Sequence, residues 1–139
     1  MTFSSEENTV VNRRNYLKSM VAALPVAGAS AASTNPIQLH CDLEVDPARE
    51  KEMLENYRKI FRPTISKQPG FVAVRLLKLR LEKRGKAPAN CPYRLIISFQ
   101  TEEQRLTWVA TDDHQRAWPT VERTLKGGLF SALLYDPVE

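Results

Sequence analysis

The sequence predicts one α+β domain, a four-stranded antiparallel sheet with helices on one face, connected in the order βαββαβ. Three observations support this fold class. Apolar and polar residues alternate over 37–45, as in a strand with one covered face. Apolar residues recur at helical spacing over 46–61 and over 101–125, and Gly or Pro separates these segments from the strands. With 139 residues, 42% hydrophobic and 26% charged, the chain has the composition of a single globular domain.

The N-terminal segment, residues 1–31, is predicted to be a cleaved twin-arginine export signal. Residues 13–18 have the sequence Arg-Arg-Asn-Tyr-Leu-Lys, which matches most of the twin-arginine pattern. A weakly apolar stretch follows, and Ala29-Ser30-Ala31 has the small-x-small pattern that signal peptidases cut, so we expect cleavage after Ala31. The alternative is an ordinary amphipathic helix, which the proline and glycine in this stretch disfavour.

Such a signal implies that the twin-arginine translocase carries the protein, already folded, into the periplasm or another extracytoplasmic space. Removing residues 1–31 leaves 17 basic and 14 acidic residues, a net charge of +3 that predicts no nucleic-acid partner. No stretch has the roughly 18 apolar residues of a membrane span, so we expect no stable membrane anchor. Residues 32–36 are expected to be a short linker, 37–135 the domain and 136–139 a tail.

The first strand is predicted over 37–45, and a helix begins directly after it. Asp46-Pro47 combines an N-cap residue with a proline at the first helical position. The helix is expected to bury a stripe of apolar residues: Met53, Leu54, Tyr57, Ile60 and Phe61.

Two strands are predicted in the middle of the chain. Gln68-Pro69-Gly70 is a turn, and the segment Phe71–Leu81 is rich in Val and Leu on both sides, which indicates a strand with both faces covered. The segment Glu82–Pro92 is charged and then rich in Pro and Ala, so we expect an exposed loop before a strand over Tyr93–Gln100.

The last third of the chain predicts two helical pieces and a final strand. Thr101 and Gln104 form a capping box for a helix through Trp108. A second piece is expected to kink or restart at Pro119. Its residues His114, Trp118, Val121 and Leu125 are predicted to share one face. Gly127-Gly128 is expected to end this helix before a strand over Leu129–Tyr135.

This order of elements is a ferredoxin-like plan. The strand over Phe71–Leu81 is predicted to have apolar residues on both sides, with Val72, Val74 and Leu76 opposite Phe71, Ala73 and Leu77. One sheet face would then be apolar and not covered by helices. That face could be solvated, but this much apolar surface favours a homodimer packed sheet against sheet.

The reactive side chains do not form a known metal or nucleotide motif. Cys41 and Cys91 could pair in an oxidising compartment or remain free. The sequence has no CxxC, HExxH, Walker loop or GxGxxG, and His40 and His114 lie 74 positions apart. We therefore expect no metal or nucleotide cofactor.

Two strings resemble the antibiotic-biosynthesis-monooxygenase (ABM) family: FRPTISKQPGFVAVRLL from Phe61 and YRLIISFQTEEQRLTWVATDDHQRAW from Tyr93. The resemblance spans roughly Ile37 to Tyr135. It implies a dimeric α+β barrel. Members of the family include cofactor-independent monooxygenases of phenols, hydroquinones or anthrones, haem-degrading enzymes, and proteins without known activity.

Haem-degrading relatives carry an asparagine on the first strand, a tryptophan on the later helical segment and a histidine ten residues beyond it. By this resemblance the corresponding residues are Cys41, Trp108 and Trp118, so only the tryptophan matches. Haem binding or degradation is therefore a minor hypothesis.

A cofactor-free oxygenase must make its substrate electron-rich, because dioxygen reacts slowly with closed-shell organic molecules. It needs a base near neutral pKa, apolar walls and a hydrogen-bond donor for the developing oxygen charge. His114 is the predicted base, although it could be an incidental residue at a helix start; His40 is a weaker one. Trp108 and Trp118, ten residues apart and so about three helical turns, are the predicted walls.

Tyr57 and Cys41 complete the predicted substrate contacts, although tryptophans and tyrosine of this kind are also common core residues and Cys41 could be a plain buried thiol. Arg75 could bind a substrate oxygen or pair with a carboxylate across a dimer. The leading hypothesis is an exported monooxygenase of a small aromatic hydroquinone or phenol, with dioxygen as co-substrate and no cofactor. The alternative is a non-catalytic dimeric module that binds a ligand or another protein.

Overall fold

The computed structural model describes residues 35–139. The predicted export signal, its cleavage site and most of the linker lie outside these residues. In chain order, the described elements are β1 (Ile37–Val45), η2 (Pro47–Arg49), α2 (Glu50–Asn56), η3 (Tyr57–Phe61), α3 (Arg62–Ile65), β2 (Phe71–Lys78), β3 (Tyr93–Phe99), α4 (Glu102–Val109), α5 (Asp112–Glu122) and β4 (Leu125–Tyr135).

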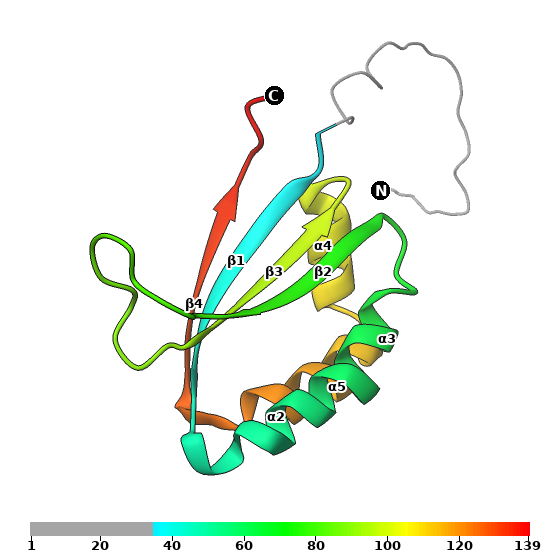
Figure 1. Cartoon of the computed structure of the whole chain (residues 1–139). Coiled ribbons are helices and arrows are strands. Elements are labelled where there is room, and N and C mark those ends of the chain that lie inside the picture. The colour runs from blue at the N-terminus through cyan, green and yellow to red at the C-terminus, as the bar shows by residue number, and fades with distance from the viewer. Residues whose placement is uncertain (1–34) are drawn as a thin grey trace, which may run out of the picture. The chain divides into compact units, whose positions relative to one another are not determined.

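The four strands form one antiparallel sheet in the order β2-β3-β1-β4. The helices lie together on one face of this sheet (Figure 1). This is the ferredoxin-like fold, so the predicted fold class is confirmed. The opposite face of the sheet, which we call the outer face, carries no helix within the described residues.

Alternation along β1 separates the two faces as the sequence predicts. Cys41, Leu43 and Val45 are buried among the helices, whereas His40 on the outer face is only partly buried. One polar side chain of the outer face, Asp42, is also buried. Arg94 satisfies its carboxylate by donating two hydrogen bonds, at 2.9 and 3.1 Å.

Strand β2 differs from the prediction at both ends. A bulge lies between Phe71 and Ala73, where the pairing with β3 shifts by one residue. The shift places Phe71 on the helix face together with Val74 and Leu76, so these residues pack against the core and not on opposite faces. The strand ends at Lys78, three residues before the predicted Leu81.

The helix predicted after Asp46 forms, but it changes its hydrogen-bond pattern along its length. Asp46 caps a short 3₁₀ turn, η2, by accepting from the Ala48 amide at 2.9 Å. The α-helix α2 follows, then the π-helical turn η3, then α3. Tyr57 and Phe61 lie at the two ends of the π-helical turn, which the sequence does not predict.

The end of the chain corrects two further predictions. Helix α5 continues through Pro119 to Glu122 without a restart. Leu125 begins β4 instead of ending the helical stripe, and Gly127 and Gly128 lie inside this strand with φ of 60° and 67°. Glycine tolerates this left-handed conformation, so the pair bends the strand start where we expected a helix break.

Within residues 35–139, no helix is long and apolar enough to cross a membrane. Cys41 and Cys91 are both free thiols, so the possible pairing does not form.

Candidate functional site

A small cavity lies between the helices and the helix-facing side of the sheet. Its volume is about 220 Å³. We call it the aromatic pocket, and it is lined by Leu39, Cys41, Phe61, Leu95, Ile97, Arg105, Trp108, Val109, His114, Trp118, Phe130 and Ala132. A cavity of about 150 Å³ holds one benzene ring, so this pocket has room for a small aromatic molecule.

Aromatic rings form most of one wall of the aromatic pocket. The Phe61 ring contacts both tryptophans edge to face, at 6.1 Å from Trp108 and 5.8 Å from Trp118. Trp118 also packs on Phe130 of β4 at 5.1 Å. These contacts restrain the rings in edge-to-face geometry, which leaves an apolar wall for a flat ligand.

The two tryptophans come from different helices, as the two predicted helical pieces imply, so their ten-residue separation does not correspond to three turns of one helix. Trp108 lies near the end of α4 and Trp118 lies in α5. Thr111 starts the second helix, because its hydroxyl accepts from the His114 amide at 3.1 Å. The chain turns at this cap and brings Trp118 back towards Phe61.

The His114 side chain lines the aromatic pocket. Its ring packs edge to face on Trp108 at 4.9 Å. The Nδ1 atom is buried and has no hydrogen-bond partner within residues 35–139. Burial, and then the nearby Arg105 guanidinium, lower the pKa of His114 below its ordinary 6.5. The imidazole is therefore neutral at neutral pH and can accept a proton from a ligand.

Arg105 is the one cation of the pocket lining, and sequence reasoning missed it. Its Nε and Nη2 atoms donate to the Glu102 carboxylate at 2.7 and 2.6 Å, which fixes the guanidinium plane. Its Nη1 atom makes no hydrogen bond within the described residues, and the side chain is 15% exposed. Its position three residues before Trp108 on α4 is the signal that could have revealed it.

Cys41 lies on the floor of the pocket, in β1, and is 4% exposed. Burial is the main cause that raises the pKa of its thiol to about 11. The thiol is therefore protonated at neutral pH, so it contributes shape and polarisability to the pocket and is a poor nucleophile.

The structure brings four of the five predicted site residues together: Cys41, Trp108, His114 and Trp118. Tyr57 does not line the aromatic pocket; it lies on the other side of η3, in a groove beside β2. His40 and Arg75 also lie away from this pocket. The His40 ring, on the outer face, hydrogen-bonds the Gln38 side chain at 3.0 Å and packs on Tyr135.

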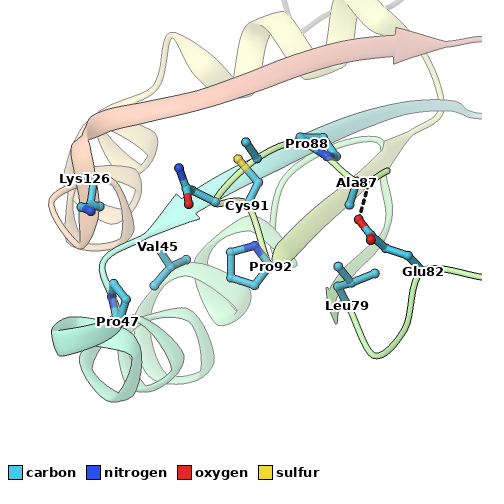
Figure 2. A pocket seen from close by; sticks show the side chains of 11 residues that line it. Val45, Pro47, Leu79, Glu82, Ala87, Pro88, Cys91, Pro92 and Lys126 are labelled. Atoms are coloured by element: carbon cyan, nitrogen blue, oxygen red, sulfur yellow. Dashed lines mark hydrogen bonds between the residues drawn. The ribbon is translucent and has the colours of Figure 1, made fainter. Parts of the chain in front are cut away.

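A second cavity, of about 390 Å³, lies under the long loop between β2 and β3 (Figure 2). Its walls include Pro47, Leu79, Cys91 and Pro92, and Figure 2 shows the Glu82 carboxylate accepting from the Ala87 amide, at 2.8 Å. None of the predicted site residues lines it. Within the described residues, no three His, Cys, Asp or Glu side chains are close enough to share a metal ion.

No protein-family model matches the chain, and no curated protein matches it. Several solved structures are similar to the chain. A "putative antibiotic biosynthesis monooxygenase" from Caulobacter crescentus is 18% identical, with a TM-score of 0.61, over 76% of this chain and 92% of that one. A protein of the same description from Bordetella bronchiseptica is 17% identical, with a TM-score of 0.61, over 76% of this chain and 100% of its own.

A third similar structure is described as a dimeric ferredoxin-like protein of unknown function, from a Jannaschia species. It is 16% identical, with a TM-score of 0.61, over 72% of this chain and 97% of that one. Proteins that share one fold carry out different reactions, so the function must be inferred from the residues of the aromatic pocket. At these identities the likeness places the chain in the ferredoxin-like fold, among structures that include several described as ABM-type monooxygenases.

Proposed function

We propose that the protein is a cofactor-independent monooxygenase that oxidises a small phenol or hydroquinone with dioxygen. The observation that carries this proposal is that His114, whose buried Nδ1 has no hydrogen-bond partner within the described residues, and Arg105 line the same pocket, which is walled by aromatic rings. A neutral base, a fixed cation and apolar walls are the three parts that phenol activation needs.

The first step is removal of the phenolic proton. His114 Nδ1 accepts that proton, and the free Nη1 of Arg105 stabilises the phenolate oxygen. The aromatic walls hold the ring flat and exclude water, which strengthens the attraction between phenolate and guanidinium. The phenolate is electron-rich enough to transfer one electron to dioxygen.

The remaining steps balance without an external reductant. Superoxide and the phenoxyl radical combine to form a carbon–oxygen bond at a ring carbon ortho or para to the phenolic oxygen. His114 then gives its proton to the distal oxygen of this peroxide and accepts the proton on that ring carbon, whose loss breaks the oxygen–oxygen bond and expels hydroxide. The hydroxide takes up the proton from His114 and leaves as water. A phenol and one dioxygen thus become a quinone and one water, and a hydroquinone becomes a hydroxylated quinone and one water.

We propose further that the active form is a homodimer joined through the outer face of the sheet. Its apolar residues are Leu77, Ile96, Leu133 and Tyr135, and three of them are 45 to 51% exposed. The similar protein from Jannaschia is described as dimeric, which supports a dimer. The twin-arginine pattern of residues 13–18 supports activity outside the cytoplasm.

Oxygen uptake with menadiol, a two-ring hydroquinone, tests the proposed function. We expect the purified full chain to consume oxygen faster than menadiol autoxidises. His114→Gln removes the base and should lower the enzymatic rate by about 10²-fold or more, as loss of a general base does. Arg123→Gln, at an exposed position away from both the pocket and the outer face, is the control and should keep the rate.

Two outcomes would contradict the proposal. One is an uptake rate equal to autoxidation for menadiol and for single-ring hydroquinones, which would favour a non-catalytic ligand-binding module. The other is a His114→Gln variant as fast as the unmodified protein. A Soret band on haem titration, with haem loss over time, would instead support the haem hypothesis.

A further inference from the structure

The aromatic pocket crosses three neighbouring strands of the sheet. Its sheet side is formed by Leu95 and Ile97 of β3, Leu39 and Cys41 of β1, and Phe130 and Ala132 of β4. These strands follow one another in the order β3-β1-β4, and β4 is the last strand of the sheet. The pocket therefore runs from the middle of the sheet to β4.

The polar groups of the pocket lie close together, over β1. Arg105 belongs to α4 and His114 to α5. The positive charge of Arg105 lowers the pKa of His114 and opposes the rise in the pKa of the Cys41 thiol, so the guanidinium lies near both side chains. A ligand whose hydroxyl meets His114 and Arg105 thus has its opposite end free to point towards β4.

At β4 the pocket continues into a row of apolar side chains. Ala132 is paired with Cys41 in the register of β1 and β4. Leu134 is paired with Leu39, and both partners in β1 line the pocket. Opposite residues of an antiparallel pair share a face, so Leu134 extends the pocket lining on the helix-facing side. We call Phe130, Ala132 and Leu134 the β4 trough, because a small alanine lies between two large side chains.

The β4 trough is exposed although it lies on the helix-facing side of the sheet. Phe130 is 39% exposed and Leu134 is 45% exposed, and Ala132 is also an exposed residue. In Figure 1 the arrow end of β4 lies clear of the described helices. The trough side chains point away from the outer face, through which we propose that two protomers join. An apolar ligand that extends out of the pocket would cover the trough.

The dimensions of the pocket and the trough indicate what such a ligand looks like. The pocket, of about 220 Å³, accommodates an aromatic ring and little more. The trough continues from Ala132 to Leu134, two residues along a strand and so about 7 Å, roughly the length of a five-carbon chain. The side chains of the trough have no hydrogen-bonding group, so they suit a hydrocarbon chain and not a polar substituent.

We propose that the substrate of the aromatic pocket is a phenol or hydroquinone that carries a hydrocarbon chain of about five carbons or more. Its ring lies in the pocket with a hydroxyl at His114 and Arg105, and its chain lies in the β4 trough. This inference rests on the proposed function and names the substrate class of the same site.

Binding of para-alkylphenols tests the role of the chain separately from the reaction. The protein has two tryptophans, Trp108 and Trp118, and both line the aromatic pocket, so quenching of tryptophan fluorescence reports a ligand there. The probes are para-cresol and the propyl, pentyl and octyl analogues, titrated into the full chain without oxygen. We expect affinity to rise about 2-fold per methylene up to pentyl, because a fully buried methylene contributes about 4-fold and the trough is open on one side. The octyl analogue should gain little more, since its chain passes beyond Leu134.

Leu134→Asp places a carboxylate in the path of the chain. In this variant para-pentylphenol should bind roughly 10-fold more weakly, while para-cresol, which does not reach the trough, should bind as it does to the unmodified chain. Leu81→Asp makes the same change at a leucine that is 64% exposed in the loop after β2, and it should leave both affinities unchanged. Equal affinity of para-cresol and para-pentylphenol for the unmodified chain would overturn the proposal. So would an unchanged affinity of para-pentylphenol for Leu134→Asp.

A second copy of this chain could cover the β4 trough instead of a ligand. Light scattering should give the same mass for Leu134→Asp as for the unmodified chain, and a lower mass for the variant would overturn the proposal. Oxygen uptake separates this inference from the proposed function. Chain-length-dependent binding without uptake of oxygen would contradict the monooxygenase and keep the ligand class. Uptake with menadiol above autoxidation, without any effect of chain length on binding, would do the reverse.

Discussion

Two histidines of this chain have the same intrinsic basicity and very different surroundings. His40 uses its Nε2 atom in a hydrogen bond with Gln38, whereas the His114 Nδ1 has no partner within the described residues. The pKa of each ring is lowered, mainly by burial, and Arg94 and Arg105 respectively add to the effect. Of the two rings, only His114 lines the aromatic pocket, so it is the one that can exchange a proton with a ligand there.

The lowered pKa of His114 predicts the pH dependence of oxygen uptake. A base must be unprotonated to act, so kcat/KM for menadiol should rise with pH through an apparent pKa below 6.5 and reach a plateau above it. The His114→Gln variant should lose this limb of the profile. A profile that rises through a pKa clearly above 6.5, or an unchanged profile in the variant, would contradict the assignment.

Arg105 is predicted to stabilise the phenolate. Arg105→Gln keeps a hydrogen-bond donor and removes the charge, and it should lower kcat/KM by roughly 10²-fold, the effect of losing one charge-stabilising donor. Arg123→Gln removes an exposed arginine that pairs with Glu52, away from the pocket, and serves as a control. Comparable rates for the Arg105 variant and the control would show that Arg105 acts only through its pair with Glu102.

At the scale of elements, the turn before β2 depends on close packing against α4. Gly70 has φ of +83°, and a Cβ added there would lie 2.1 Å from Gln104 Oε1. Gly85 has a similar φ of +77° with no atom near its missing Cβ. The two glycines therefore separate backbone strain from steric overlap.

Gly70→Ala is accordingly expected to destabilise the protein more than Gly85→Ala. Both substitutions place alanine in the left-handed region, which costs about 1 kcal/mol, and only the first must also displace the Gln104 side chain. Chemical denaturation of the full chain should show a lower midpoint for Gly70→Ala. Equal midpoints would mean that Gln104 moves aside without cost.

The helical elements also explain which site residues the sequence could predict. Tyr57 and Phe61 are four residues apart, and a regular α-helix would place them on one face. Their rings do stack, with centres 6.3 Å apart, yet Phe61 lines the aromatic pocket and Tyr57 lines the groove beside β2. Helical spacing identifies the shared face but not which of two cavities each ring borders, so Tyr57 could not be excluded in advance.

At the scale of the whole molecule, the outer face of the sheet predicts association of two protomers. Light scattering of the full chain at micromolar concentration should give the mass of a dimer. Leu133→Arg places a charge on the outer face and should give the mass of one protomer. Leu106→Arg, at an exposed position of α4, is the control and should remain dimeric. A single-protomer mass for the unmodified chain would contradict the dimer.

The export prediction concerns the segment outside the described residues. Arg13→Lys/Arg14→Lys keeps the charge of the motif and removes the arginine pair that the translocase recognises. In a bacterium with this translocase, we expect the unmodified protein in the periplasmic fraction and the variant in the cytoplasm. Lys18→Arg is the control. Equal periplasmic amounts of both variants would contradict a twin-arginine signal.

The sequence by itself determined the order of elements, the fold class and four residues of the pocket lining. The alternation of apolar residues in β1 and their helical spacing in α5 each reflect a local backbone conformation with one buried face. Such a pattern can be recognised from neighbouring residues of the sequence alone. Residue type and spacing therefore suffice to predict Cys41, Trp108, His114 and Trp118 on the covered side of the sheet, where the aromatic pocket lies.

Only the tertiary structure decided three things: the place of Arg105 in the pocket lining, the position of Tyr57, and the cationic groove beside β2. Each depends on contacts between segments that are distant in the sequence, such as Arg105 with the β1 thiol or Arg62 with the β2 edge. The β2 bulge, which shifts the pairing with β3 by one residue, and the π-helical turn were not predicted either. Periodicity cannot reveal such shifts, because the residue types on either side of them stay the same.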